Sequence, residues 1–414
     1  MNLPQDELHA WLALAGGNHL SRARARRLLA HFGGPVEVFQ AGLREAENAL
    51  GGEPCSGYFA AVQPLAGVAD RTRRWLAEGS ERHVMTLADA HYPASLLESP
   101  DPPLVLHALG ALACLQRPAV ALVGSRHATP AGVLTAKRLS TELATLGIEV
   151  VSGLAVGIDA AAHEAALSVG GLGSTVAVVG CGLQEVYPRA HQGLFDQIAQ
   201  RGLVLSEHPL GTPALPAYFP QRNRIIAGLS VAVVVVEAAL RSGSLITARL
   251  ATEAGRDVFA VPGHLSSPQS AGCNWLIKNG AGLLEHVRDI IEAQPGAFSA
   301  DICAAVQPVK RRSSRSMRQE SGRSNQSLIL QPPGASASAP HTAEDTDLPA
   351  GFALASWARA RQLLRSRSCD LAELSTAASV GTSEMTRALL MAELEGLVAR
   401  LPGGLYQWCG HMRR

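Results

Sequence analysis

Apolar residues follow two different patterns along the chain, and the pattern changes near residue 119. Residues 3–30 place leucines at helical spacing on both sides of the Gly16–His19 segment, which predicts two helices joined by a turn. From residue 119 to residue 261, short and almost continuously apolar runs alternate with longer amphipathic stretches. Strands that are buried on both faces of a parallel sheet have such continuous apolar runs.

The alternation predicts a doubly wound α/β domain of the Rossmann class over residues 85–295. A small helical domain over residues 1–80 precedes it. The expected strands are 119–123, 148–151, 175–179, 203–205, 231–236 and 258–261. The expected helices are 130–146, 158–169, 191–201, 222–229 and 244–255.

The second N-terminal helix carries four arginines close together, namely Arg22, Arg24, Arg26 and Arg27. A helix, a glycine turn and a second helix are compatible with a hairpin that binds the DNA backbone, a helix-hairpin-helix-like arrangement. An ordinary helical domain with a solvated arginine face explains the same pattern, and we favour that interpretation.

Residues 296–350 contain almost no periodic apolar signal. Basic residues gather at 310–323, and prolines and serines follow. Such a segment cannot bury enough apolar surface to order itself, so we expect a disordered linker that is basic and then Pro/Ser-rich. Its basic half either touches nucleic acid or only keeps the linker solvated.

Residues 352–409 predict helices followed by a β-hairpin, which is the arrangement of a winged-helix domain. The expected recognition helix carries Glu384, Glu393 and Glu395 but only Arg387. An acidic helix fits poorly into a DNA major groove, so we favour a protein-contact or structural role over DNA reading.

The charges of the chain are almost balanced, which limits the ways in which the chain could bind nucleic acid. The 414 residues hold 36 basic and 35 acidic side chains, a net charge of +1, and 47% of the residues are hydrophobic. The hydrophobic content predicts folded domains, and the balance argues against a generally sticky polycation. Residues 101–295 hold 13 basic and 14 acidic residues, so any affinity for nucleic acid must come from a few well-placed side chains. All but three of the basic residues are arginine, which suits phosphate recognition but is explained equally by codon bias.

Several classes of protein are excluded by missing patterns. No apolar run reaches the ~18 residues of a membrane span, and the first ten residues lack the order of a signal peptide, so we expect a cytoplasmic protein. The seven cysteines are scattered without a CxxC pair, which argues against a zinc site or disulfides. The P-loop, G-x-G-x-x-G, HExxH and G-x-S-x-G patterns are absent, which argues against a P-loop ATPase and a dinucleotide site, and we expect no cofactor.

Three loops at the carboxyl ends of predicted strands carry the candidate chemistry, because ligands of open α/β sheets bind at that edge. The first loop is Gly124-Ser125-Arg126, in which glycine permits a tight turn, the next helix offers N–H groups, and arginine adds a charge. This combination predicts a phosphate cradle. The second loop begins at Ser152-Gly153 and opens a helix with Asp159 and His163 four residues apart. The two form either an acid–base pair or, as we favour, a structural pair at a helix start.

The third loop is Phe219-Pro220-Gln221-Arg222-Asn223-Arg224. Phe219 could stack on a base while Arg222 and Arg224 bind successive phosphates, which is how proteins hold unpaired strands. Alternatively, Phe219 belongs to the core and one arginine pairs with Glu237 or Glu207. A further helix start that suits an anion follows the next strand, at Ser242-Gly243-Ser244.

Taken together and in this order, these loops resemble the DNA-processing protein A family (DprA, also called Smf). The pairs Tyr187-Pro188 and Ser206-Glu207 and the triplet Val261-Pro262-Gly263 add to the resemblance, which covers residues 120–285. Members often have an N-terminal domain of the sterile-alpha-motif type and a C-terminal winged helix, which fits both flanks of this chain.

The resemblance implies a cytoplasmic bacterial protein that binds and protects single-stranded DNA during natural transformation (competence). It further implies a homodimer that helps to load the recombinase RecA and has no catalysis. The implied strand-binding residues are Gly124, Ser125, Arg126, Ser152, Gly153, Arg189, Phe219, Arg222, Asn223, Arg224, Ser242, Gly243 and Ser244. Three departures stand out: Pro216 replaces a lysine found in many members, His191 replaces an asparagine, and the linker is long.

A rival hypothesis is a Rossmann-fold enzyme resembling the nucleotide phosphoribohydrolases, with Glu237, Asp159 and His163 as the working groups. That group usually has a P-G-G-x-G-T loop, whereas this chain has Arg241-Ser242-Gly243-Ser244. A third hypothesis, an interaction scaffold that uses the winged helix, is compatible with strand binding.

Overall fold

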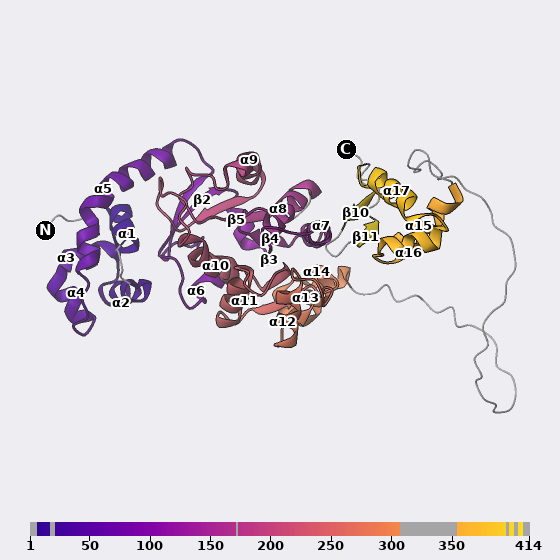
Figure 1. Cartoon of the computed structure of the whole chain (residues 1–414). Coiled ribbons are helices and arrows are strands. Elements are labelled where there is room, and N and C mark those ends of the chain that lie inside the picture. The colour runs from indigo at the N-terminus through magenta and orange to yellow at the C-terminus, as the bar shows by residue number, and fades with distance from the viewer. Residues whose placement is uncertain are drawn as a thin grey trace, which may run out of the picture. The chain divides into compact units, whose positions relative to one another are not determined.

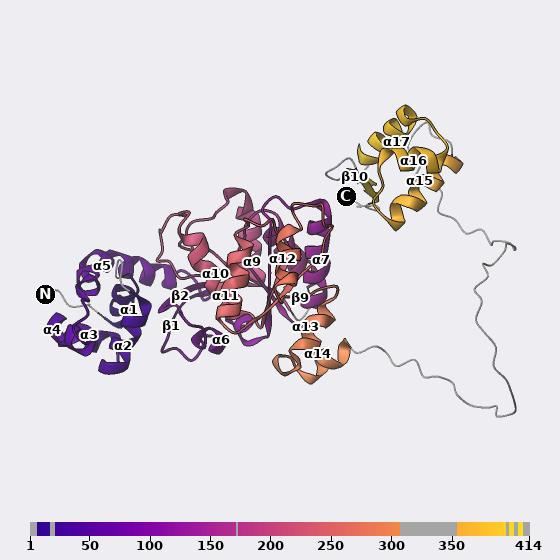
Figure 2. The same ribbon diagram turned by 60° about the horizontal axis from the view of Figure 1, so that its bottom comes forward.

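The computed structural model describes residues 6–16, 21–170, 173–306, 354–394, 397–400 and 405–408. The chain divides into two compact units, Met1–Gln307 and Pro308–Arg414, and each is described by itself. Figures 1 and 2 show both units.

Five helices form the N-terminal part of the first unit. They are α1 (Glu7–Ala15), α2 (Arg22–Phe32), α3 (Pro35–Ala41), α4 (Leu43–Ala49) and α5 (Ser56–Ala77). The side chains of Asp6 and Ser21 cap α1 and α2 by accepting hydrogen bonds from the first-turn amides. The helices enclose a core that also includes Leu104 and Val105 of the following domain. The helical part is therefore packed onto the α/β domain rather than tethered to it.

A nine-stranded sheet forms the centre of the unit, in the order β1-β2-β6-β5-β4-β3-β7-β8-β9. The strands are β1 (Arg82–Thr86), β2 (Val105–Gly110), β3 (Ala119–Gly124), β4 (Glu149–Ser152), β5 (Thr175–Val178), β6 (Leu203–Ser206), β7 (Ala232–Glu237), β8 (Asp257–Ala260) and β9 (Gly282–Leu283). The seven strands that lie from β6 to β9 in this sheet order are parallel to their neighbours. β2 pairs with β6 and β1 pairs with β2, both in antiparallel register. The predicted doubly wound α/β class and its six parallel strands are confirmed. The sequence analysis missed β1, β2 and β9, which are short or interrupted by polar residues.

Helices cover both faces of this sheet (Figures 1 and 2). One face carries α6 (Ala94–Leu97), α10 (Tyr218–Leu229), α11 (Ser244–Glu253) and α12 (Ala271–Lys278). The other carries α7 (Pro130–Thr145), α8 (Ile158–Val169), α9 (Gln192–Arg201) and α13 (Val287–Ala293). Most predicted helix bounds agree to within two residues, but α10 begins at Tyr218 instead of residue 222. Phe219 is therefore part of the first helical turn and not of a loop.

Ordered structure continues past residue 295, where the linker was expected to begin. A 3-10 turn and α14 (Ala300–Ala305) follow, and Phe298 is buried against the α7 side of the sheet. The expected linker from residue 307 to residue 350, including its basic segment at 310–323, lies outside the described residues.

The second unit contains α15 (Leu354–Ser366), α16 (Leu371–Ala378), α17 (Thr382–Leu394), β10 (Val398–Arg400) and β11 (Tyr406–Trp408). The two strands pair in antiparallel register, and the helices share one small core with them. Three helices and a strand pair are the order that a winged helix requires. Assignment of the unit as a winged-helix domain stays a prediction.

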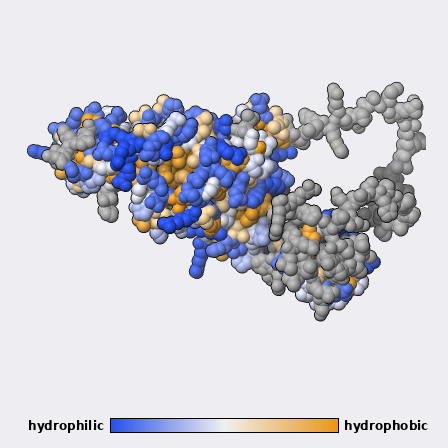
Figure 3. Space-filling view, turned by 90° about the horizontal axis from the view of Figure 1, so that it is seen from above, coloured by the Kyte–Doolittle hydropathy of each residue, from blue (hydrophilic) through white to orange (hydrophobic). Residues whose placement is uncertain are grey.

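The surface view in Figure 3 shows apolar residues interspersed among hydrophilic ones on one face of the chain. Among the described residues, no helix combines the length and the apolar character needed to cross a bilayer.

Candidate nucleic-acid interface

A cleft opens where the winding direction of the sheet reverses. From β3 the chain adds β4, β5 and β6 on one side, and it then returns to place β7 on the other side of β3. Such a switch point leaves a crevice at the carboxyl ends of the two strands, which is where ligands of this fold class bind. The cleft there has a volume of about 670 Å³ and is lined by residues that follow β3 and β7 and by the start of α10. We call it the strand-end cleft.

Close packing fixes the loop that follows β3. A Cβ atom on Gly124 would lie 2.5 Å from Cγ1 of Ile158 and 3.0 Å from the carbonyl oxygen of Glu237, so only glycine fits. The backbone N–H of Ser125 donates to that same carbonyl oxygen at 2.7 Å. Arg126, the next residue, is exposed and lines the cleft. The loop thus fixes the backbone position of an exposed arginine.

The N-terminus of α7 is already occupied by an anion from the chain itself. The carboxylate of Glu237, which is 5% exposed, accepts hydrogen bonds from the N–H of Thr129 at 3.1 Å and from its hydroxyl at 2.7 Å. A carboxylate at this position satisfies the first-turn amide and the helix dipole. The phosphate cradle expected from the Gly124–Ser125 backbone and this helix start is therefore not free. Positive charge in the cleft must come from side chains.

An aromatic pair stands at the mouth of the cleft. The ring centroids of Tyr187 and Phe219 are 5.2 Å apart, and Tyr187 is 50% exposed. The guanidinium carbon of Arg126 lies 5.5 Å from the centroid of the Phe219 ring, within the range of a cation–π interaction. Two partly exposed rings beside a cation form a surface on which a flat, anionic ligand can stack. We call these three residues the stacking platform.

Helix geometry separates the two arginines of α10. Residues two positions apart point about 200° away from each other around a helix, so Arg222 and Arg224 cannot both face one ligand. Arg222 points inward, is 5% exposed, and donates to the carbonyl oxygens of Val178 at 3.0 Å and Gly153 at 2.9 Å. Burial lowers the pKa of its guanidinium to about 10. Its contacts are those of a brace that joins α10 to β5 and to the loop after β4.

Arg224 points away from the cleft and binds two carboxylates. Its Nη2 donates to Oε2 of Glu207 at 2.5 Å, and its Nε lies 3.4 Å from Oδ2 of Asp101. The alternative that one arginine of this stretch pairs with Glu207 is therefore realised. Asn223, between the two arginines, lines the cleft.

The loop after β4 lies beneath the cleft, which it lines through Ala155. The hydroxyl of Ser152 is fully buried and donates to the carbonyl oxygen of Leu122 at 2.6 Å. The N–H of Gly153 donates to Oδ2 of Asp159 at 3.1 Å. A Cβ atom on Gly153 would lie 1.6 Å from Nη1 of Arg222, so glycine is required under the guanidinium.

Asp159 and His163 are both tied to the same loop and to its neighbours. His163 is fully buried and bonds to the hydroxyl of Thr175 at 2.7 Å and to the N–H of Leu154 at 3.3 Å. Burial lowers the pKa of His163 to about 3 and raises the pKa of Asp159. These contacts match the structural pair that the sequence analysis favoured.

The rim of the cleft adds a second exposed cation, Arg241, and the small residues 242–244 at the start of α11. The hydroxyl of Ser242 accepts a hydrogen bond from the N–H of Ser244 at 3.2 Å, so part of that helix start is already capped. Arg189 is exposed on a neighbouring 3-10 turn and is not among the residues that line the cleft.

Sequence reasoning did not single out Tyr187 and Arg241 as site residues, although Tyr187 belongs to the Tyr187-Pro188 pair and Arg241 directly precedes Ser242-Gly243-Ser244. The sequence does contain a signal for both residues, because each lies next to a loop at the carboxyl end of a strand. Their orientation toward Phe219 and the cleft depends on packing that the sequence alone does not show.

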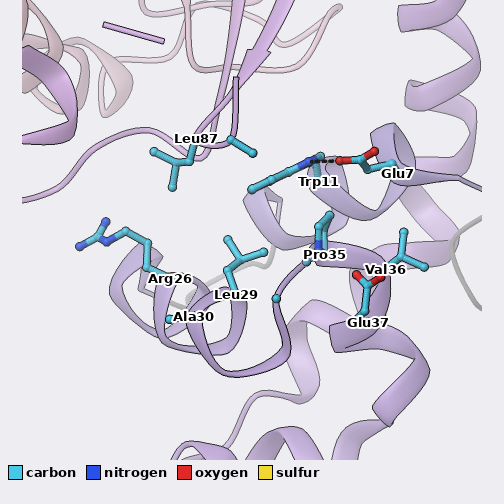
Figure 4. Close-up of a pocket in the computed structure, with 12 residues that line it drawn as sticks. Glu7, Trp11, Arg26, Leu29, Ala30, Pro35, Val36, Glu37 and Leu87 are labelled. Atoms are coloured by element: carbon cyan, nitrogen blue, oxygen red, sulfur yellow. Dashed lines mark hydrogen bonds between the residues drawn. The ribbon is translucent and has the colours of Figure 1, made fainter. Parts of the chain in front are cut away.

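A second cleft, of about 610 Å³, lies between α1, α2, α3 and the chain after β1 (Figure 4). Three of its polar side chains, Glu7, Trp11 and Arg26, have partners within the chain. The indole N–H of Trp11 donates to Glu7 at 3.3 Å, and Arg26 donates to Asp101 at 3.3 Å. Arg24 and Arg27 bind Glu53 on the same side of the helix. The arginines of α2 thus stabilise the fold, and this region lacks the freely presented cations of the strand-end cleft.

Known proteins provide an independent comparison. The family model described as DNA recombination-mediator protein A matches residues 83–295. The chain is 46% identical over 206 residues to DNA processing protein DprA of Streptococcus pneumoniae, which covers 50% of this chain and 72% of that protein. It is 46% identical over 219 residues to Protein Smf of Escherichia coli, covering 53% of this chain and 58% of that protein.

A solved structure shows the same fold. The X-ray structure of DNA processing protein A from Streptococcus pneumoniae superposes with a TM-score of 0.60 and 36% sequence identity. The match covers 69% of this chain and 97% of the other. The resemblance inferred from the strand-end loops is confirmed by these matches.

The brace formed by Arg222 is open to a direct test. Replacement Arg222→Lys keeps the charge but cannot reach both carbonyl oxygens, so two buried acceptors lose a charged donor. We expect a loss of about 2 kcal/mol or more in the free energy of unfolding, measured by urea denaturation. The matched control, Arg241→Lys on the rim, should change it by less than about 0.5 kcal/mol. Equal stability of the two variants would show that Arg222 does not brace the loop.

Proposed function

The chain belongs to the DNA recombination-mediator protein A family, and from this premise we propose that its strand-end cleft binds single-stranded DNA. The observation that carries the proposal is the stacking platform, in which Arg126 lies beside the Phe219 and Tyr187 rings at the switch point of the sheet. Proteins hold unpaired strands by combining aromatic rings that stack on bases with cations that follow the phosphates. The matched relatives carry names that refer to DNA processing.

The platform favours an unpaired strand over a duplex for a geometric reason. In a duplex the faces of the bases are covered by their neighbours, whereas an unpaired base can turn its face to an aromatic ring. A cleft of about 670 Å³ is large enough to admit a base with its sugar and phosphate. The exposed Arg126 and Arg241 then lie where they can contact the flanking phosphates.

The electrostatic attraction for DNA phosphates comes from a few side chains in the cleft and not from the whole protein surface. Residues 101–295 are close to electrically neutral, and Glu237 already occupies the start of α7. Two exposed arginines in the cleft neutralise about two phosphates, so log K should fall with log salt at a slope of roughly 1.4 for a single strand. The absence of a lysine at position 216 keeps this number small.

The contacts of the acidic groups support binding without catalysis. An enzyme of the phosphoribohydrolase type would use Glu237, Asp159 and His163. In this structure each of the three is hydrogen-bonded to backbone or hydroxyl groups that hold the loops in place. We therefore propose a strand-binding protein as the main function and retain the enzyme only as the alternative that release of free base from nucleotides would reveal.

We further propose a homodimer formed along the β9 edge of the sheet. Trp275 and Leu283 are 49% and 47% exposed there, although large apolar side chains are usually buried. They lie on α12 and on the two-residue edge strand β9, and a groove of about 710 Å³ runs beside Trp275. An exposed strand edge next to apolar side chains is a natural pairing surface for a second copy of the chain.

The family also supports a role in natural transformation, in which the protein works in the cytoplasm and helps RecA to form on the strand it protects. The name of the family, recombination mediator, is consistent with that role. Transfer to a recombinase requires a strand that is held by few contacts, and the stacking platform together with Arg241 offers few.

The binding proposal is tested with a short unpaired oligonucleotide at several salt concentrations. We expect Arg126→Ala to weaken binding about tenfold at low salt and to lower the salt slope by about 0.7, because one phosphate contact is lost. Fluorescence anisotropy measures both quantities. Arg138→Ala on α7, whose side chain pairs with Glu142 outside the cleft, is the matched control and should bind like the wild type. Equal affinity for duplex and unpaired DNA, or an unaffected Arg126→Ala variant, would contradict the proposal.

The dimer is tested by replacing Trp275 with aspartate, which places a charge in the apolar contact. Sedimentation equilibrium should give twice the chain mass for the wild type and the single chain mass for Trp275→Asp. Leu97→Asp, at an apolar residue of similar exposure on α6, serves as the control and should remain dimeric. A monomeric wild type would remove the proposal.

The recombinase proposal is tested by the onset of ATP hydrolysis by RecA on a strand coated with a single-strand-binding protein. The wild-type chain should shorten the lag several-fold, and Arg126→Ala should shorten it less. A lag that does not change when the wild-type chain is added would exclude RecA loading.

A further inference from the structure

The N-terminal helices and the strand-binding helix α10 meet at a cluster of charged side chains that the strand-end cleft does not use. Its members are Arg22 on α2, Asp101 before β2, Glu207 after β6 and Arg224 on α10; we call them the junction cluster. The side chain of Arg22 is 31% exposed, and those of Glu207 and Arg224 are each 13% exposed. Charges this far removed from water are costly unless they are paired.

The geometry makes Arg22 the link between the two parts. Its Nε donates to Oδ2 of Asp101 at 2.8 Å, and its Nη1 lies 3.5 Å from Oε1 of Glu207. Arg224 binds the same two carboxylates from the other side. Two carboxylates are thus shared between an arginine of α2 and an arginine of α10. Removal of Arg22 leaves Arg224 as the partner of Glu207, and it leaves Asp101 with Arg224 and with a 3.3 Å contact from Arg26.

The ionisation of the cluster agrees with this pairing. Burial opposes the charged form of Asp101, but the hydrogen bond from Arg22 and the charges of both arginines outweigh it, and the pKa of the carboxyl lies below its ordinary value. Burial lowers the pKa of the Arg224 guanidinium, and the attraction of Glu207 only partly offsets this effect.

The cluster reaches the stacking platform through one more contact. The ring of His208, next to Glu207 in the chain, lies 4.1 Å from the ring of Tyr218, the first residue of α10. Phe219 follows directly. An apolar contact joins the same two parts of the unit, since Leu29 of α2 lies opposite Leu87 of the α/β domain (Figure 4). A shift of α2 would therefore displace the start of α10.

We propose that Arg22 is a positioning residue, through which the N-terminal helical domain holds the start of α10, and with it Phe219, in the orientation that binds a strand. The inference rests on the proposed strand binding for its functional consequence, but the coupling itself is a property of the protein without DNA. It assigns the N-terminal helices a role in shaping the site instead of contacting DNA themselves. A contiguous set of side chains carries the coupling.

The test uses Arg22→Ala in the full chain, with Arg27→Ala as the matched control. Arg27 lies on the same helix, is more exposed, and pairs with Glu53 within the N-terminal domain. Hydrogen exchange of the α10 amides without DNA should rise about fivefold in Arg22→Ala and stay unchanged in Arg27→Ala. If Arg22→Ala does not fold, Asp101→Asn, which keeps the side-chain shape, should show the same rise. Unchanged exchange in α10 overturns the proposal whether or not the protein binds DNA.

The second readout separates positioning from contact with DNA. Arg22→Ala should lower strand affinity about fivefold while the salt slope stays that of the wild type, because no phosphate contact is lost. A lower slope would show that Arg22 touches the strand itself and would overturn the positioning role. If the wild type does not bind a strand at all, the proposed function fails, and the exchange measurement still decides whether the N-terminal helices hold α10.

Discussion

The contact between the carboxylate of Glu237 and the first turn of α7 is the constraint on which the strand-end cleft depends. It joins the end of β7 to the loop after β3, the two strands between which the sheet reverses direction. By filling the helix start with a negative charge of the chain, it removes the backbone anion site that a phosphate would otherwise use. In the proposed binding mode, side chains at the rim carry the recognition, above all Arg126, Phe219 and Tyr187.

The buried polar groups beneath the cleft have one common effect. Arg222 binds carbonyl oxygens of β5 and of the loop after β4, and Asp159 and His163 bind backbone N–H groups of the same loop. Residues that the sequence suggested as candidates for catalysis thus fix the loop that lies beneath the cleft. A rigid floor limits the entropy that is lost when a flexible strand is bound, because only the strand must become ordered.

Sequence reasoning predicted the sheet well because its central strands are buried on both faces, and continuous apolar runs such as Val231–Val236 permit little else. It predicted the family from the order of the strand-end loops. It failed where a side chain's direction mattered. Arg222 and Arg224 lie two positions apart on α10, so Arg222 points into the protein while Arg224 points toward the junction cluster. No composition or spacing distinguishes a buried arginine from one that faces a ligand.

The same limit applies to the arginines of α2. Their density suggested either a DNA-binding hairpin or a solvated face, but their acidic partners, Glu53 and Asp101, lie far along the chain. Only the fold brings them together. The arginines of α2 are therefore used for internal pairing, and among the described residues Arg126 and Arg241 are the exposed arginines that line the cleft.

The most direct test of the account is photocrosslinking of an unpaired oligonucleotide that contains 5-iodouracil, followed by mass spectrometry of the crosslinked peptides. Iodouracil reacts with aromatic side chains that stack on it. The account predicts that the crosslinks fall on the peptides that contain Tyr187 and Phe219 and disappear from the latter in Phe219→Leu. Crosslinks confined to the N-terminal helices or to the C-terminal unit would contradict it.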